Sequence, residues 1–259
     1  TSTTREIMPD IATKNPQYVP GHGLLAGKGV LITAAAGSGI GSSTARKCIE
    51  EGARVVISDK HERRLAETAA ELGVVGIQCD VTNEESVQNL IAQAAKELGA
   101  IDVLVNNAGL GGTAQLHEMT DEQWSIVLDV TLNGTMRCTR AALNHMYPRG
   151  TGVIVNNASV LGWRAQEGQA HYAAAKAGVM ALTRCAAIEA GPRGVRINAV
   201  SPSIAMHANL AKVTSDELLA ELTQREAFGR FAEPWEIANV IVFLASDYSS
   251  YMTGEVLSV

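Results

Sequence analysis

Three residues in the second half of the chain are of types that together could move a proton. Tyr172 and Lys176 stand four residues apart at the start of a predicted helix, so their side chains project from one face, one turn apart. A free tyrosine titrates near pH ~10, and a nearby ammonium favours its phenolate. Ser159, 13 residues before Tyr172, ends a predicted strand and can hydrogen-bond a substrate oxygen. Singly, each residue type is more often structural; together they predict a proton-transfer site.

A glycine-rich turn in the first half of the chain predicts a nucleotide cofactor. A predicted strand runs directly into it and a helix follows, so backbone amides and the helix dipole can hold a pyrophosphate. Asp59 ends the next predicted strand, where a carboxylate can bind the adenosine ribose hydroxyls and repel a 2′-phosphate; we therefore expect NAD rather than NADP. Lys60, Arg63 and Arg64 would offset part of that repulsion. The turn residues expected to bind are Thr33, Gly37, Ser38, Gly39, Ile40 and Gly41.

The elements that must position these residues alternate along the chain. Short runs rich in Val and Ile, apolar on both faces, predict buried parallel strands, and the segments between them show helical spacing. We expect an α/β fold with one doubly wound Rossmann domain, a seven-stranded parallel sheet with helices on both faces. The expected strands are Val30–Ile32, Arg54–Ser58, Val74–Cys79, Ile101–Val105, Val153–Asn157, Val195–Val200 and Glu255–Val259. The expected helices are Ser42–Glu51, Glu62–Leu72, Glu84–Leu98, Asp121–Met146, Tyr172–Ala190 and Trp235–Ser246.

Helix starts and domain limits are also marked. Two helix starts have the spacing of capping boxes, Thr82 with Glu85 and Thr120 with Gln123. Residues 1–23 are polar, contain three prolines and lack periodicity. This segment is predicted to be an extended arm that precedes a single domain over residues 24–259.

The composition excludes several classes of function. The chain has 259 residues, a net charge of −6 and no long run of one sign, which argues against nucleic acid as the main partner. There is no signal peptide and no apolar run of the ~18 residues that cross a bilayer, so we expect a cytoplasmic protein without a membrane partner. The four cysteines show no metal-ligand spacing, which predicts core-filling thiols in a reducing compartment and no metal site: Cys48, Cys79, Cys138 and Cys185.

Further motifs resemble the short-chain dehydrogenase/reductase family. Asp80-Val81 follows the third predicted strand, and Asn106-Asn107-Ala108-Gly109 follows the fourth. The resemblance implies that Asp80 contacts adenine. It also implies a catalytic role for the serine, tyrosine and lysine, with the last two reaching the nicotinamide ribose as well. The segment implied to line the adenosine side comprises Asn107, Ala108 and Gly109.

The chain departs from that family's pattern at three places. In the turn, Ala34 replaces the first glycine and one extra residue precedes Gly39, which predicts a reshaped pyrophosphate loop. The family's catalytic asparagine, which holds a relay water near the lysine, is replaced by Thr131; Asn133 points about 200° around the helix and is not expected to substitute. We hypothesise that the Thr131 hydroxyl keeps the relay in altered form. Ser203 replaces a glycine near the nicotinamide.

The substrate side is predicted from the loops after the fifth and sixth strands. Trp163 offers a flat apolar wall and Arg164 an anchor for an anion, although both also suit an ordinary surface loop. Residues 204–230 are expected to form a mobile lid. By resemblance, Pro202 and Ile204 close over the nicotinamide, and the remaining candidate substrate contacts are Gln166 and His207.

The overall resemblance, over residues 25–259, is to the 3-oxoacyl-carrier-protein reductase type. Residues 33–37, 59–64 and 157–164 resemble a narrower actinobacterial group associated with steroid ring breakdown, which oxidises a hydroxyl on a bicyclic propanoyl-CoA fragment. Three functions stay open: an NAD-dependent alcohol dehydrogenase on a CoA-linked ring or acyl substrate, an NADP-dependent 3-oxoacyl reductase, and a non-catalytic nucleotide-sensing protein. The family also implies a homotetramer.

Overall fold

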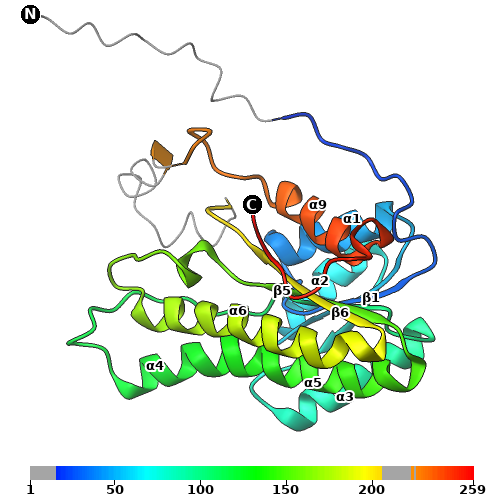
Figure 1. The fold of residues 1–259 in the computed structure, drawn as a ribbon, viewed down its shortest axis with the longest axis horizontal. Coiled ribbons are helices and arrows are strands. Elements are labelled where there is room, and N and C mark those ends of the chain that lie inside the picture. Colours follow the sequence, from blue (N-terminus) through cyan, green and yellow to red (C-terminus); the bar gives the residue numbers. More distant parts are fainter. Residues whose placement is uncertain (1–15, 206–222, 225) are drawn as a thin grey trace, which may run out of the picture.

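The structure, a computed structural model, describes residues 16–205, 223–224 and 226–259. Within them, seven strands form one sheet in the order β3-β2-β1-β4-β5-β6-β7, and every neighbouring pair is parallel (Figure 1). The expected seven-stranded parallel Rossmann sheet is confirmed. The strands are β1 (Gly29–Ile32), β2 (Arg54–Asp59), β3 (Val75–Gln78), β4 (Val103–Asn106), β5 (Gly152–Asn157), β6 (Val195–Ser201) and β7 (Val256–Ser258).

Helices cover both faces of the sheet, as expected for a doubly wound fold (Figure 1). Apolar side chains of α1, α2 and α9 pack on one face, and those of α3, α5 and α6 pack on the other. The strand order reverses between β1 and β4, and ligands of such folds bind beyond the carboxyl ends of the strands at this point. The helices are α1 (Ile40–Glu50), α2 (Glu62–Leu72), α3 (Glu84–Leu98), α4 (Asp121–Leu128), α5 (Gly134–Met146), α6 (Ala170–Ala190) and α9 (Pro234–Ala245). The shorter helical turns are η1 (Asp129–Asn133), η2 (Tyr147–Arg149), η3 (Val160–Gly162), η4 (Gly191–Arg193) and η5 (Asp247–Ser249).

Two elements differ from the sequence expectation. The segment expected as one helix over Asp121–Met146 consists of α4, the π-helical turn η1 and α5. Apolar spacing continues on both sides of η1, so periodicity does not reveal the extra residue that a π turn holds. In addition, β3 was expected to be buried, but three of its four residues are exposed because it lies at the edge of the sheet.

The two expected capping boxes have different outcomes. The box at Thr120 is confirmed. The box at Thr82 is wrong: Asn83 precedes α3 instead, and its side-chain oxygen accepts from the Ser86 N–H at 2.8 Å. Thr82 is occupied elsewhere, because its hydroxyl donates to Asp80 at 2.7 Å.

The cysteines also divide into two groups. Three are buried in the core, as expected, but Cys185 on α6 is exposed. Among the described residues, no helix is both long and apolar enough to pass through a bilayer. Likewise, in this part of the chain no group of three His, Cys, Asp or Glu side chains is placed to hold a metal ion.

The described part of the expected arm lies against the domain. The hydroxyl of Tyr18 donates to Glu50 of α1 at 2.6 Å, and its ring meets Trp235 of α9 edge-on, with 5.2 Å between the ring centres. Residues 16–23 therefore join α1 to α9. Residues 1–15, the rest of the expected arm, lie outside the described residues.

Candidate active site

The three residues predicted to move a proton come together at the carboxyl end of β5. Ser159 follows this strand, and its hydroxyl oxygen accepts from the Leu161 N–H at 3.2 Å. Tyr172 and Lys176 lie in the first turns of α6, with the lysine Nζ 5.6 Å from the centre of the tyrosine ring. Lys176 is 3% exposed and donates to the Asn157 carbonyl at 2.6 Å. A hydroxyl, a phenol and an ammonium therefore share one edge of the sheet.

Burial changes the proton affinities of the two α6 residues in opposite directions. It raises the pKa of Tyr172, and a hydrogen bond with the Ser159 side chain offsets part of that rise. It lowers the pKa of Lys176 to about 8. We expected the lysine charge to lower the tyrosine pKa, but the net shift is upward: burial is the largest effect, and the partial offset comes from Ser159. The protonated phenol is thus the stable form at neutral pH, suited to donating a proton.

Thr131 occupies the place of the family's asparagine, inside the π turn η1. Its hydroxyl oxygen accepts from the Leu110 N–H at 3.0 Å and donates to the Leu110 carbonyl at 3.3 Å. Gly109 lies between Thr131 and Lys176: a Cβ added to it would be 3.4 Å from the lysine Nζ and 3.9 Å from the threonine hydroxyl. Thr131 therefore fixes the loop after β4 at the point where this loop passes the lysine.

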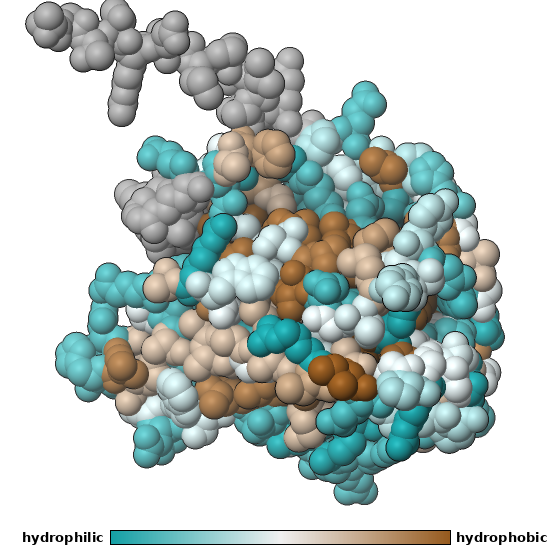
Figure 2. All heavy atoms as spheres, viewed as in Figure 1, coloured by the Kyte–Doolittle hydropathy of each residue, from teal (hydrophilic) through white to brown (hydrophobic). Residues whose placement is uncertain are grey.

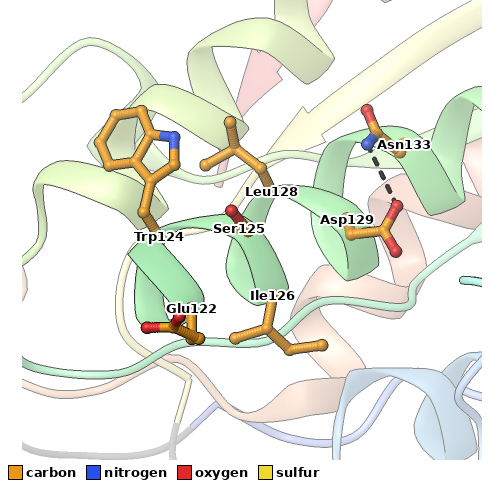
Figure 3. Close-up of a pocket in the computed structure, with 7 residues that line it drawn as sticks. All are labelled: Glu122, Trp124, Ser125, Ile126, Leu128, Asp129 and Asn133. Atoms are coloured by element: carbon orange, nitrogen blue, oxygen red, sulfur yellow. Dashed lines mark hydrogen bonds between the residues drawn. The ribbon is translucent and has the colours of Figure 1, made fainter. Parts of the chain in front are cut away.

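The opposite side of η1 faces a surface hollow. Asn133 donates from its side-chain amide to the Asp129 carboxylate at 3.1 Å (Figure 3). Both residues line a hollow of about 530 Å³ together with Trp124 and Ile126. Asn133 is therefore engaged away from Thr131, as the sequence predicted.

A chain of side-chain amides connects the lysine to the glycine-rich turn. Asn157, whose carbonyl holds Lys176, donates from its side chain to the Asn107 side-chain oxygen at 2.9 Å. Asn107 donates in turn to the Ala34 carbonyl at 2.9 Å, and Thr33 accepts from the Asn107 N–H at 3.0 Å. Sequence reasoning missed Asn157 as a site residue; an amide at the end of a buried strand was the available signal.

The glycine-rich turn has the features that a dinucleotide needs. A Cβ on Gly41 would lie 2.5 Å from the Asn107 side-chain nitrogen and 2.7 Å from the Ala34 carbonyl, so only glycine fits there. The helix α1 begins after Gly39, and no side chain of the described residues caps it. Its first N–H groups and its dipole are therefore available to an anion, which fits the pyrophosphate of the expected cofactor.

The expected reshaping of the turn centres on Ala34. Among the described residues other than glycine, it alone has a positive φ, at 50°. A side chain with a Cβ is disfavoured in this left-handed conformation, whereas glycine is not. Ala34 thus adopts the left-handed backbone conformation that suits the glycine found at this place in the family, although it has a side chain.

Two carboxylates lie at the carboxyl ends of neighbouring strands: Asp59 is the last residue of β2, and Asp80 follows β3. Asp59 is buried, and its oxygens accept from the N–H groups of Ala36 at 3.3 Å and His61 at 2.9 Å. Asp80 forms an ion pair with Lys60 at 2.7 Å. Although burial favours the neutral acid, hydrogen bonding by Lys60 holds the pKa of Asp80 below its ordinary value. Lys60, expected to offset repulsion at Asp59, is therefore directed to Asp80.

The expected substrate wall lies beside Ser159. The Pro202 carbonyl accepts from the Val160 N–H at 3.0 Å, so the chain after β6 lies against the turn η3. Trp163 is 50% exposed, and both Arg164 and Gln166 are exposed. Arg164 makes no ion pair within the described residues. This loop therefore presents an apolar ring next to a guanidinium that has no carboxylate partner in the described part of the chain.

The expected lid is described only at its ends. The Ile204 carbonyl accepts from the Ala232 N–H at 2.9 Å, which joins the two ends of the segment 204–230. Residues 206–222 lie outside the described residues, and so does the candidate contact His207.

Comparisons with known proteins identify the family of the chain. Residues 34–259 match the family model described as enoyl-(acyl carrier protein) reductase. The chain is 63% identical over 252 residues to a Mycobacterium tuberculosis protein named (5R,7aS)-5-hydroxy-7a-methyl-1-oxo-2,3,5,6,7,7a-hexahydro-1H-indene-carboxyl-CoA reductase, covering 94% of this chain and 96% of that protein. It is 35% identical to a Staphylococcus aureus 3-oxoacyl-[acyl-carrier-protein] reductase, covering 90% and 96%. A short-chain dehydrogenase structure from Mycobacterium smegmatis superposes with a TM-score of 0.86 at 59% identity, covering 95% and 97%.

The chain therefore belongs to the short-chain dehydrogenase/reductase family, as the sequence motifs predicted. It is an NAD(P)-dependent oxidoreductase that acts on CH–OH groups.

The buried charge of Lys176 predicts a pH-dependent stability. Its pKa of about 8 in the folded chain lies below the ordinary 10.5, so the unfolded chain binds more protons between these values and stability rises with pH across this window. We expect Lys176→Met to remove a destabilisation of up to about 3 kcal/mol that is fully present below pH 8. Unfolding of the cofactor-free protein and the variant at several pH values would measure it.

In Lys176→Met the hydrogen bond to Asn157 is also lost. This loss changes the free energy of unfolding of the variant by an amount that does not vary with pH. The free energy of unfolding of the variant minus that of wild type should therefore fall by up to about 3 kcal/mol from pH 8 to 10.5, whatever its sign at pH 8. Lys96→Met, at an exposed position on α3, should show no such trend. A gap that is constant with pH would contradict a depressed lysine pKa.

Proposed function

We propose that the protein interconverts a secondary alcohol and a ketone on a CoA-linked ring, with NAD as its cofactor. The observation that carries the reaction type is the position of the Ser159 hydroxyl beside the Tyr172 phenol, with Lys176 held at the same strand end. Support for the substrate class comes from the 63% identical relative, which is named for a bicyclic indene carboxyl-CoA. A cytoplasmic location stays a prediction.

In this proposal Tyr172 handles the proton of the reacting hydroxyl. The bound cofactor supplies hydride transfer to or from the carbon. As the phenol, Tyr172 gives its proton to the oxygen during reduction and becomes a phenolate; during oxidation the phenolate takes the alcohol proton and the phenol is restored, while Ser159 hydrogen-bonds that oxygen. Lys176 stabilises the charge that develops on the phenolate. Because Lys176 is buried, its interaction with the phenolate is stronger than it would be in solvent.

Two features of the loop after η3 suit a CoA thioester. Trp163 offers an apolar surface to a ring, and the guanidinium of Arg164 has no carboxylate partner within the described residues. A planar cation that is free and exposed matches the phosphates of CoA. We therefore assign Trp163 and Arg164 to the substrate side, with Gln166 beside them.

The preference for NAD is supported by the surroundings of Asp59. Its buried carboxylate stands at the strand end where the adenosine ribose binds in such folds. A 2′-phosphate would bring two negative groups together there, and Lys60, the next residue in the chain, is paired with Asp80. Arg63 is likewise paired, with Glu67 at 3.8 Å. These pairs leave less positive charge to accommodate NADP.

A substrate and cofactor screen tests the proposed function. The purified protein would be given NAD or NADP with 3-hydroxyacyl-CoA esters or with hydroxylated bicyclic ring CoA esters, and formation of reduced nicotinamide would be followed. We expect turnover with the ring ester and NAD, and a loss of about 100-fold or more in Tyr172→Phe with NAD binding retained. Asp59→Ala should raise the kcat/KM ratio of NADP to NAD by roughly tenfold.

Other outcomes would assign a different function. Faster reduction of straight-chain 3-oxoacyl esters with NADPH would favour the 3-oxoacyl reductase alternative. Tight NAD binding with no hydride transfer to any alcohol or ketone would favour a nucleotide-sensing protein.

Thr131 generates a second kinetic prediction. We propose that its hydroxyl supports the proton path by fixing Leu110 and by offering its remaining lone pair to a water beside Lys176. Thr131→Val should lower turnover by about tenfold and shift its pH profile, and Thr131→Ser, which keeps the hydroxyl, should restore both. Unchanged turnover and pH profile in Thr131→Val would refute this role.

We also propose that the protein is a homotetramer, assembled in part through the outer side of α4. An apolar patch of Trp124 and Ile126 is exposed there, with exposures of 37% and 46%, and both side chains line the hollow beside η1. Figure 2 shows apolar side chains gathered over the region of α4 and α6. Exposed apolar clusters on soluble proteins commonly mark contacts between chains.

The proposed assembly can be tested by measuring the mass in solution. Wild type should have about four times the mass of one chain, and Ile126→Glu should shift it to smaller species because a charge in an apolar contact is costly. Val75→Glu makes the same kind of change on the exposed edge strand β3 and should leave the mass unchanged. A monomeric wild type would exclude the tetramer.

A further inference from the structure

Three consecutive backbone N–H groups of the glycine-rich turn face β2 and α2. The N–H of Ala35 donates to the Ser58 carbonyl at 3.0 Å, and that of Ala36 donates to Asp59 at 3.3 Å. The N–H of Gly37 donates to the hydroxyl oxygen of Thr68, on α2, at 3.0 Å. The turn is therefore held to its neighbours along the side where Asp59 stands.

Thr68 is unusual among these partners because it comes from a helix rather than from the strand end. It is 5% exposed and lies on the side of α2 that packs towards the sheet, next to Ala69. Gly37 has a φ of 91°, which a residue with a side chain rarely adopts. The bond to Thr68 thus fixes the one part of the turn with the greatest conformational freedom.

The hydrogen bond between Gly37 and Thr68 is made by the part of the turn that contains the extra residue. On the other side, the Ala34 carbonyl is held by Asn107, and Gly41 fits closely beneath both. With these ends fixed, the added length must project between Ala35 and Gly39. Thr68 holds that projection against α2, beside the carboxylate that is proposed to bind the adenosine ribose.

We propose that Thr68 is a positioning residue for cofactor choice: by engaging the Gly37 N–H it seats the lengthened turn beside Asp59 and favours NAD over NADP. This proposal rests on the NAD preference given above and extends it to a residue outside the turn. It assigns Thr68 no direct contact with the reacting atoms.

Thr68 can affect the choice between NAD and NADP because it changes how many backbone N–H groups near the ribose are free to donate. A 2′-phosphate needs donors to compensate its charge. The N–H groups of Ala35, Ala36 and Gly37 are backbone donors on this side of the turn, and all three are used, by Ser58, Asp59 and Thr68. Removing the threonine hydroxyl would release the Gly37 N–H for a phosphate. It would also leave the turn less preorganised for NAD, which weakens binding.

The test compares Thr68→Val with wild type, using KM and kcat for NAD and for NADP with one alcohol substrate. Valine keeps the shape of threonine and removes the hydroxyl. We expect the kcat/KM preference for NAD over NADP to fall by about three- to tenfold, the effect of one hydrogen bond. The change should lie in KM, with kcat nearly constant, because α2 is remote from the reacting groups. Thr68→Ser should restore the preference.

Thr44→Val is the matched control. Thr44 is also fully buried, but its hydroxyl donates only within its own helix, to the Ile40 carbonyl at 2.7 Å. The control should leave the cofactor preference unchanged. If Thr68→Val lowers the unfolding temperature but leaves the preference and KM for NAD at wild-type values, Thr68 is merely structural and the proposal is overturned. If Thr68→Val does not fold, Thr68→Ala is judged by the same ratio.

This experiment tests the preference for NAD and the role of Thr68 separately. The wild-type ratio alone tests whether NAD is preferred. The change of that ratio between wild type and Thr68→Val tests the role of Thr68, whichever cofactor the wild type prefers.

Discussion

The backbone carbonyl of Asn157 accepts a hydrogen bond from the amine of the buried Lys176. The rest of the site is arranged around that contact. Lys176 loses its hydration in the core, and one short hydrogen bond replaces only part of it. The same Asn157 holds Asn107, which holds the Ala34 carbonyl in the cofactor turn. A single line of hydrogen bonds therefore crosses the carboxyl edge of the sheet, from the residue that tunes the proton transfer to the loop that binds the nucleotide.

Buried amides beneath this edge keep the strands in register. Asn106 of β4 donates to Asn156 of β5 at 2.9 Å and to Thr139 of α5 at 3.0 Å, and Asn156 donates to Thr183 of α6 at 2.9 Å. Polar groups inside a core cost free energy unless they are paired. Because the N–H groups of both amides find these acceptors only when the strands and helices are aligned, the network favours one alignment over others.

Much of the fold could be predicted because its signals are local. Val- and Ile-rich runs, helical spacing and the order of elements indicated the parallel sheet, and the four-residue step from Tyr172 to Lys176 indicated a shared helix face. The exposed edge strand β3 and the exposed Cys185 were missed because burial depends on what packs alongside, which one sequence does not show. The contacts of Asn157 and Thr68 were missed because their partners are far away in the chain.

The π turn η1 joins two helices that would otherwise be one. Because it holds one residue more than an α-helical turn, α5 is rotated by about 100° relative to a straight continuation of α4. This rotation lets Thr131 point to the loop beside Lys176 while Trp124 and Ile126 stay on the outside. A chain shorter by one residue between positions 129 and 133 could keep the inward threonine or the outward apolar patch, but not both. The length of this turn thus couples the interior of the site to the exterior of the molecule.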